Sequence, residues 1–167
     1  MSCILNLGYA LPCREGSGGN EKLYLASYSA TTSWSVDSNN IITGGTGYNQ
    51  FFDFEVDSEI LGFIENGAFT KFGGVYTQTL TTKLFNITQT ERDILKLLSQ
   101  TRVVCITKTN KGKYFLGGKV HGLWLTTVDI TAGVMMEDEA TITLTLLGKE
   151  ANPADEVNSA LITTLIA

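Results

Sequence analysis

Hydrophobic and polar residues alternate along most of this chain with a period of two, the pattern of β-strands that bury one face. The alternation is clearest where Thr or an acidic residue separates Phe, Leu, Val or Ile. It predicts strands at residues 21–36, 41–42, 52–56, 75–85, 103–107, 114–116 and 140–147. We therefore expect a mainly β protein, built as an antiparallel β-sandwich or barrel.

The central part of the stretch 84–106 departs from this pattern and predicts a helix set between two strands. Thr88 and Glu91 have the spacing of a capping box, which satisfies the first amides of a helix. Apolar residues then recur at intervals of three and four: Ile94, Leu95, Leu97 and Leu98. We expect one packed α-helix at about 88–100, with this stripe facing the core.

Glycine-containing segments predict the turns. Asn66-Gly67 is a strong two-residue hairpin signal, and residues 109–113 form a second turn in which Gly112 supplies a positive φ. Residues 44–47, GGTG, are expected to be a loop. A phosphate-binding loop would need a helix directly after it, and an aromatic, strand-like run follows instead.

Three carboxylates, Asp53, Glu55 and Asp57, occupy alternate positions and are expected on one strand face, about 7 Å apart. A divalent cation would need more oxygens converging from several directions, so an acidic solvent or interface face is the favoured interpretation. The single histidine, His121, lacks the companions of a catalytic triad or zinc site and is expected in a turn or the core. We expect no metal, no cofactor and no enzymatic activity.

The 167 residues carry a net charge of −5 with scattered Lys and Arg, which argues against a protein that grips nucleic acid. No apolar run reaches the ~18 residues of a membrane span. Residues 1–12 are expected to form an extended arm. This apolar N-terminus lacks the features of a signal peptide, so we expect a soluble protein made in a reducing cytoplasm. Cys105 is expected in the core, and pairing of Cys3 with Cys13 is left open.

Several short motifs carry a resemblance to a known family. They are Glu65-Asn66-Gly67, Leu97-Leu98, KGKYFLG at residues 111–117 and TLTLLGKE at residues 143–150. With these, nearly all of residues 1–152 resembles small virion proteins of tailed phages and prophages of gut bacteria, the tail-tube-like (major tail protein) family. Lys111 stands where members often have Asn, a departure confined to a turn.

The resemblance implies a tail-tube-like fold of two antiparallel sheets with a helix on one side. It implies a virion protein, assembled in the host bacterial cytoplasm, that forms homo-oligomeric rings, expected to be hexamers, in the phage tail. Stacked rings would make a tube, whereas a single ring would line the DNA channel, which DNA only passes through. Partners would be other tail or connector proteins. Capsid decoration or a head–tail connector is the alternative function.

An acidic or neutral channel would repel phosphates and let DNA slide. The Asp53, Glu55 and Asp57 face is a candidate for that lining, with an outward-facing interface as the alternative.

Residues 153–167 are expected to form an interaction arm beyond the β domain of residues 1–152. Asn152 is suited to cap a helix and Pro153 to begin it, and Asp155-Glu156 favours its first turn. An extended arm is the alternative. The apolar residues of this segment need a covering surface, and we predict that they dock on a neighbouring subunit or another virion protein: Leu161, Ile162, Leu165 and Ile166, together with Val157.

Overall fold

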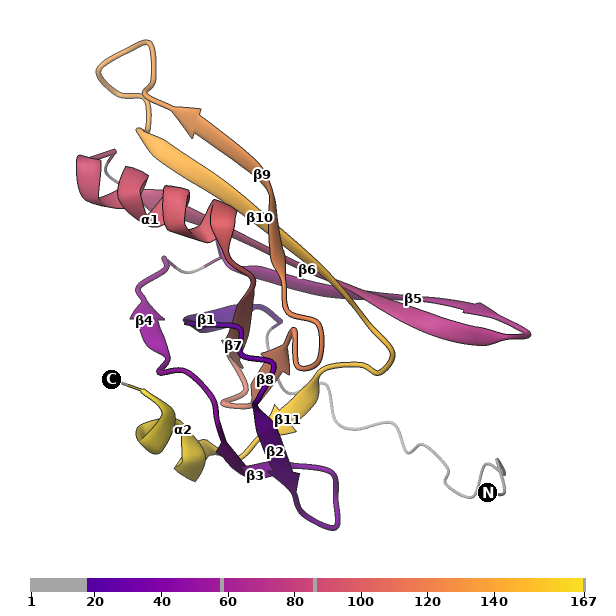
Figure 1. Cartoon of the computed structure of the whole chain (residues 1–167). Coiled ribbons are helices and arrows are strands. Elements are labelled where there is room, and N and C mark those ends of the chain that lie inside the picture. Colours follow the sequence, from indigo (N-terminus) through magenta and orange to yellow (C-terminus); the bar gives the residue numbers. More distant parts are fainter. Residues whose placement is uncertain (1–17, 58, 86, 167) are drawn as a thin grey trace.

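The computed structural model describes residues 18–57, 59–85 and 87–166 (Figure 1). The predicted N-terminal arm and Cys3 and Cys13 lie outside these residues. The strands are β1 (Asn20–Ser27), β2 (Ser33–Val36), β3 (Ile42–Thr46), β4 (Phe52–Phe54), β5 (Gly62–Thr70), β6 (Gly73–Phe85), β7 (Val103–Thr109), β8 (Tyr114–Gly117), β9 (Trp124–Thr131), β10 (Thr141–Glu150) and β11 (Asp155–Val157). The helices are α1 (Gln89–Gln100) and α2 (Ser159–Leu165).

The described strands form two sheets. One has seven strands in the order β2-β3-β11-β8-β7-β1-β4, and the other has four in the order β5-β6-β10-β9. All pairs are antiparallel except β11 with β3, where Val157 lies opposite Ile42. The prediction of a mainly β, two-sheet fold with a packed helix is confirmed. Within the described residues neither sheet closes into a barrel, and a second, shorter helix is present.

Two hydrophobic clusters lie on opposite faces of the seven-stranded sheet. The first fills the space between the sheets and joins Leu23 and Cys105 to Leu80, Leu144 and Leu98 of α1. The second lies on the other face, where Tyr24 and Ile106 pack with residues of α2. Strands β1 and β7 are thus buried on both faces, which explains the unbroken run Val103–Ile106 and corrects the prediction of a half-buried first strand. That strand also ends at Ser27, and β2 is separate.

Helix α1 begins as predicted, with the capping box in place: the Thr88 N–H donates to Glu91 Oε2 at 3.0 Å. Leu95 and Leu98 are buried, but Leu97 is exposed, so its prediction as a core residue is wrong. Successive residues turn by about 100° around a helix, which carries Leu97 out of the stripe that contains Leu95 and Leu98.

The hairpin of β5 and β6 turns later than predicted. Asn66 and Gly67 lie inside β5, and the turn is Lys71-Phe72, closed by the pair Thr70 and Gly73. The Thr70 hydroxyl donates to the Gly73 carbonyl and accepts from the Phe72 N–H. Long cross-strand pairing therefore overrides the local Asn-Gly signal. Figure 1 shows the hairpin extending far beyond the rest of the molecule.

The GGTG segment is also strand rather than loop, since Gly44 to Thr46 belong to β3 and pair with β2. A Cβ at Gly45 would lie 2.7 Å from the Trp34 ring, which stacks on Tyr48 at 5.7 Å between centroids. Gly45 thus makes room for an aromatic ring. The turn at residues 109–113 is confirmed, with Gly112 at φ 76°.

The C-terminal segment is part of the fold and not an arm outside it. Residues 155–157, predicted as a first helical turn, form β11 between β8 and β3, because pairing with both neighbours outweighs the local helix signals. The helix is shorter and begins later, capped by the Asn158 side chain, which accepts from the Ala160 N–H at 2.9 Å.

The apolar residues of this segment are covered by the chain itself. Ile162 and Leu165 are buried, and Leu161 and Ile166 pack half-buried on the same cluster. The prediction that they dock on a neighbouring subunit is therefore wrong for the buried pair. In the described part of the chain, neither helix is long and apolar enough to cross a membrane.

Candidate assembly surfaces

Within residues 18–57, 59–85 and 87–166, the four-stranded sheet has two open edges, β5 and β9. Both strands are long, with 9 and 8 residues, and most of their residues are exposed. Because β5, β6, β10 and β9 are successively antiparallel, β9 runs opposite to β5. A second copy in the same orientation would therefore present its β5 to the first copy's β9 in antiparallel sense. Such edges are templates for pairing with another chain.

The outer face of this sheet is rich in threonine. Leu80, Leu144 and Leu146 point to the core, so the alternate residues point away from it. We call the following outward residues the threonine face: Thr77, Thr79, Thr81, Thr127, Thr131, Thr143 and Thr145. The charged residues at outward positions of β6, β9 and β10 are Lys83, Asp129 and Lys149. This face is thus nearly neutral.

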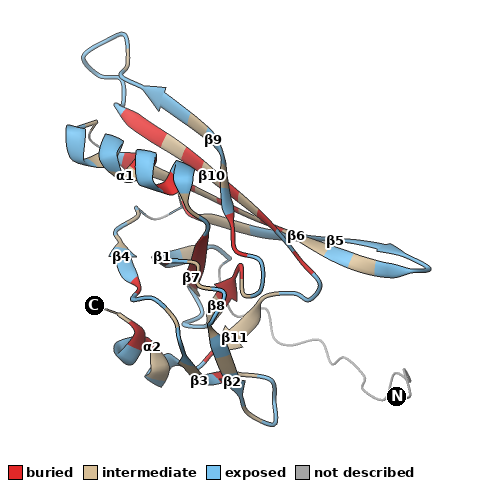
Figure 2. Ribbon diagram, viewed as in Figure 1, coloured by how far each residue is buried: buried red, intermediate tan, exposed pale blue. Residues whose placement is uncertain are grey.

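An apolar groove of about 700 Å³ lies between α1, β4, the end of β6 and the start of β7. Leu84 and Leu98 are buried at its base, and Phe52, Phe85 and Leu97 are exposed around it. Figure 2 shows the exposed outer side of α1 and the exposed β4 that flank it. The groove can accept apolar side chains, because its lining is mostly Leu, Ile, Val and Phe.

Carboxylates border this groove at Glu55 and Glu91, and none of the described Lys or Arg residues lines it. Asp53 is also part of the lining, but it lies opposite Tyr24, so its side chain points to the other face of the sheet. The Thr88 hydroxyl, hydrogen-bonded to Glu91, holds the pKa of Glu91 below its usual value, which keeps that carboxylate charged. The groove is therefore suited to a ligand that is apolar and positively charged.

The predicted row of three acidic residues is only partly formed. Strand β4 ends at Phe54, so Glu55 and Asp57 lie beyond it, and Asp57 does not line the groove. Asp53 lies opposite Tyr24 across the strand pair. Burial raises the pKa of Tyr24, and the nearby Asp53 carboxylate raises it further. Of the three, Glu55 thus borders the groove and Asp53 points to the other face of the sheet, and none of them belongs to the threonine face. Among the described residues, no three His, Cys, Asp or Glu side chains are grouped to hold a metal ion.

The tip of the β5–β6 hairpin is a second apolar surface. Phe72 is 89% exposed, and the Lys71 Nζ lies 4.8 Å from the centre of its ring. Phe69 is 67% exposed and meets Tyr76 edge to face at 5.4 Å. A Cβ at Gly74 would lie 2.2 Å from the Phe69 ring, so this glycine lets the ring lie flat along the strand. Exposed aromatic rings together with a cation are typical of binding surfaces.

A third exposed apolar segment is the loop after β9, at residues 132–140. Val134 is 97% exposed, and both methionines are exposed as well. The Asp138 carboxylate accepts from the Val134 and Met135 N–H groups, each at 2.8 Å, and these bonds lower the pKa of Asp138. The loop is therefore held in one shape by its own side chain.

His121 lies in a turn, which is one of the two locations predicted for it. Its ring Nδ1 lies 3.3 Å from Glu150 Oε2. Glu150 is buried and accepts from the Val120 and His121 N–H groups at 3.0 and 2.8 Å. The pair therefore anchors a turn.

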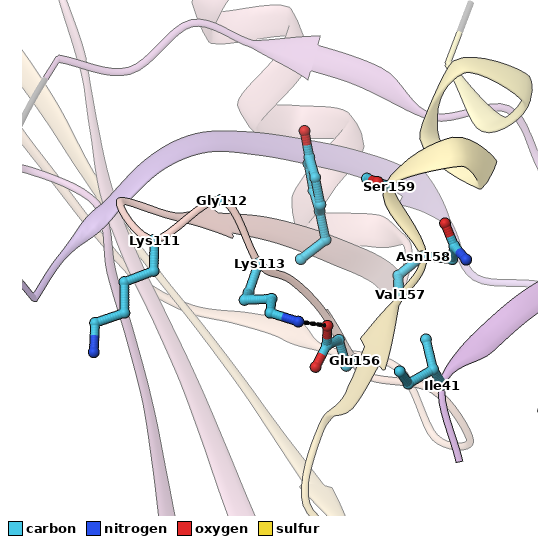
Figure 3. A pocket seen from close by; sticks show the side chains of 9 residues that line it. Ile41, Lys111, Gly112, Lys113, Glu156, Val157, Asn158 and Ser159 are labelled. Atoms are coloured by element: carbon cyan, nitrogen blue, oxygen red, sulfur yellow. Dashed lines mark hydrogen bonds and ion pairs between the residues drawn. The ribbon is translucent and has the colours of Figure 1, made fainter. Parts of the chain in front are cut away.

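A shallow polar hollow of about 330 Å³ lies beside β11, shown in Figure 3. Lys113 Nζ pairs with Glu156 Oε1 at 2.6 Å, and Lys119 Nζ pairs with Asp155 Oδ2 at 2.5 Å nearby. These ion pairs join β11 to the β8 region, so the hollow serves the packing of the C-terminal segment.

Sequence reasoning identified Asp53 and Glu55 but missed the groove and the hairpin tip. The groove unites three stretches that are distant in sequence, residues 25–27, 52–55 and 84–103, so no local pattern marks it. The aromatic residues around Lys71 were the one available signal for the tip. A comparison with protein-family models finds none that matches the chain, and a comparison with curated proteins finds no significant match.

Proposed function

We propose that this chain is a structural subunit of a phage tail, which joins edge to edge with its own copies into a ring around the DNA channel. The observation that carries this proposal is the pair of open edges, β5 and β9, in one antiparallel sheet. The phage context comes from the sequence resemblance. The role is structural and not catalytic.

Pairing of β9 with the next copy's β5 is a heterologous contact, in which two different surfaces meet. Such contacts close into rings when the rotation between copies divides a full turn. The paired sheets would then form one continuous antiparallel sheet around an axis. Ring closure removes both open edges, which a soluble monomer would otherwise leave unprotected.

The threonine face is the surface that would line the channel. Its hydroxyls are neutral, and its three charged residues, Lys83, Asp129 and Lys149, nearly cancel. A lining of this kind gives DNA no cluster of Lys and Arg to bind, so the duplex passes without being held. Asp53, Glu55 and Asp57, once candidates for the lining, lie on or beyond the other sheet.

Light scattering after size-exclusion chromatography, with negative-stain imaging of the same fractions, tests the proposal. The protein should elute as a closed oligomer with a central channel. Asp129→Pro and Ile130→Pro each place a proline at one of two neighbouring positions of the β9 edge. Because successive N–H groups of a strand point in alternate directions, one of these two residues directs its N–H away from β10, and a proline there leaves the β9–β10 pairing intact. The variant that keeps its circular dichroism spectrum should be monomeric.

Glu137→Pro, in the exposed loop after β9, is the matched control and should still form rings. A monomer at all concentrations, or folded edge variants that assemble normally, would contradict the proposal. Oligomers without a channel would favour the capsid-decoration alternative.

A further inference from the structure

We propose that the tip of the β5–β6 hairpin of one copy inserts into the apolar groove beside α1 of a second copy, with Lys71 meeting the carboxylates on the groove rim. This contact deepens the proposed function, because it would stack one ring on the next. It is a different surface from the paired edges, so the two contacts can be tested separately.

The tip has the form of a preorganised ligand. Its two-residue turn is closed by the paired Thr70 and Gly73, and the Thr70 hydroxyl bonds to both sides of the turn. Phe72 is nearly fully exposed, and Phe69 lies along the strand behind it. Little conformational freedom remains to be lost when such a tip binds. In the described structure nothing else covers these two rings.

The groove supplies the matching surface. Its volume of about 700 Å³ lies within the range of pockets that bind ligands of several rings, roughly 300–1,000 Å³. Leu84 and Leu98 form an apolar base, and the rings of Phe52 and Phe85 stand at the side. Aromatic side chains entering this groove would remove apolar surface from water on both partners.

Charge complementarity favours the hairpin tip as the occupant of the apolar groove. Two carboxylates, Glu55 and Glu91, border the groove, and no described Lys or Arg lines it, whereas the tip carries a lysine beside its exposed ring. Of the exposed apolar segments, residues 132–140 offer only acidic side chains, Glu137, Asp138 and Glu139, which the groove would repel. The hairpin tip is both apolar and positive.

Geometry prevents a chain from filling its own groove. The tip lies directly before β6, and the last residues of β6 line the groove. Strand β6 has 13 residues and is therefore roughly 40 Å long. Figure 1 places the tip and α1 at opposite ends of the molecule. Tip and groove must therefore join different copies head to tail, and in a ring every tip would project from the same side.

Mixed disulfide cross-linking tests the contact. One chain carries Phe72→Cys and the other Leu97→Cys, both with Cys3→Ser and Cys13→Ser, while Cys105 stays because it is buried. Mild oxidation of the mixture should give a heterodimer as the main product. Phe72→Cys mixed with Asn39→Cys, on the exposed β2–β3 turn, is the control and should give none.

A charge exchange adds a second readout. Lys71→Glu should form single rings that no longer stack, as seen in negative-stain images, and Lys71→Glu with Glu55→Lys should stack again. Rings without a cross-link, or stacking unaffected by Lys71→Glu, would overturn the inference and leave the proposed function standing. Cross-linked chains that never close into rings would overturn the proposed function and leave this inference standing. A cross-link from Leu97→Cys to residues 1–17, with Cys3 and Cys13 restored, would show that another segment occupies the groove and would also overturn the inference.

Discussion

Leu97 and Leu98 are neighbours in α1 but belong to different surfaces. Leu98 is 6% exposed and packs in the cluster between the two sheets, whereas Leu97 is 60% exposed on the rim of the apolar groove. One side of the helix therefore holds the sandwich together, and the other leaves an apolar side chain exposed at the groove. The two side chains have the same volume, so they form a matched pair for separating stability from assembly.

Leu98→Ala should lower the free energy of unfolding by about 2–5 kcal/mol, because it opens a cavity in a packed core. Leu97→Ala should lower it by less than about 1 kcal/mol, since surface changes cost little, but should weaken stacking. Urea denaturation of the isolated subunit measures both values. Equal losses for the two variants would mean that Leu97 is also a core residue.

Deletion of residues 153–167 should lower the melting temperature sharply. It removes β11 from the middle of the seven-stranded sheet and uncovers Ile42, Phe51 and Leu116. Leu165→Ala alone should cost about 2–5 kcal/mol. Thr164→Ala, at an exposed position of the same helix, is its control. A truncated protein that melts as the full chain does would show that the segment is an independent arm after all.

Thr82→Val should stabilise the protein by about 1–3 kcal/mol. The Thr82 side chain is fully buried on the core side of β6, and its hydroxyl has no hydrogen-bond partner among the described residues. An unpaired buried hydroxyl costs roughly this much, and Val fills the same space. The control is Thr81→Val on the threonine face, which should change stability little. Destabilisation by Thr82→Val would reveal a bonded hydroxyl.

Cys105 should be unreactive in the folded protein and should make folding sensitive to alkaline pH. Burial raises the pKa of this thiol from 9.0 to about 12. The stability tied to the neutral thiol is complete below about pH 9 and is lost as pH rises toward about 12, because only the unfolded chain readily ionises there. Cys105→Ala should remove this part of the alkaline loss, as denaturation at pH 8 and pH 10.5 would measure. An identical alkaline loss in the variant would contradict the assignment.

Local patterns predicted those parts of the fold that depend on local physics. The capping box of Thr88 and Glu91 fixed the start of α1, and the apolar runs of β7 and β10 marked buried strands. Errors arose where distant pairing outweighed a local signal. Asn66-Gly67 is a turn sequence, yet its register with Thr77 and Tyr76 keeps it within a strand.

The C-terminal segment and the groove show the same limit. Asn152, Pro153 and Asp155 carry helix-start signals, but β8 and β3 draw Asp155–Val157 into the sheet. The candidate surfaces depend on which strands lie at an edge and on segments brought together from three places in the sequence. Neither property can be recognised in a single stretch of sequence, so the sequence predicted the rim carboxylate Glu55 but not the groove beside it.

Electron cryomicroscopy of the assembled protein tests the central claim most directly. We expect a ring in which β9 of each subunit pairs antiparallel with β5 of the next, and in which Thr79, Thr81 and Thr145 face the channel. A ring closed through other surfaces, with β5 and β9 left unpaired or the threonine face turned outward, would contradict it.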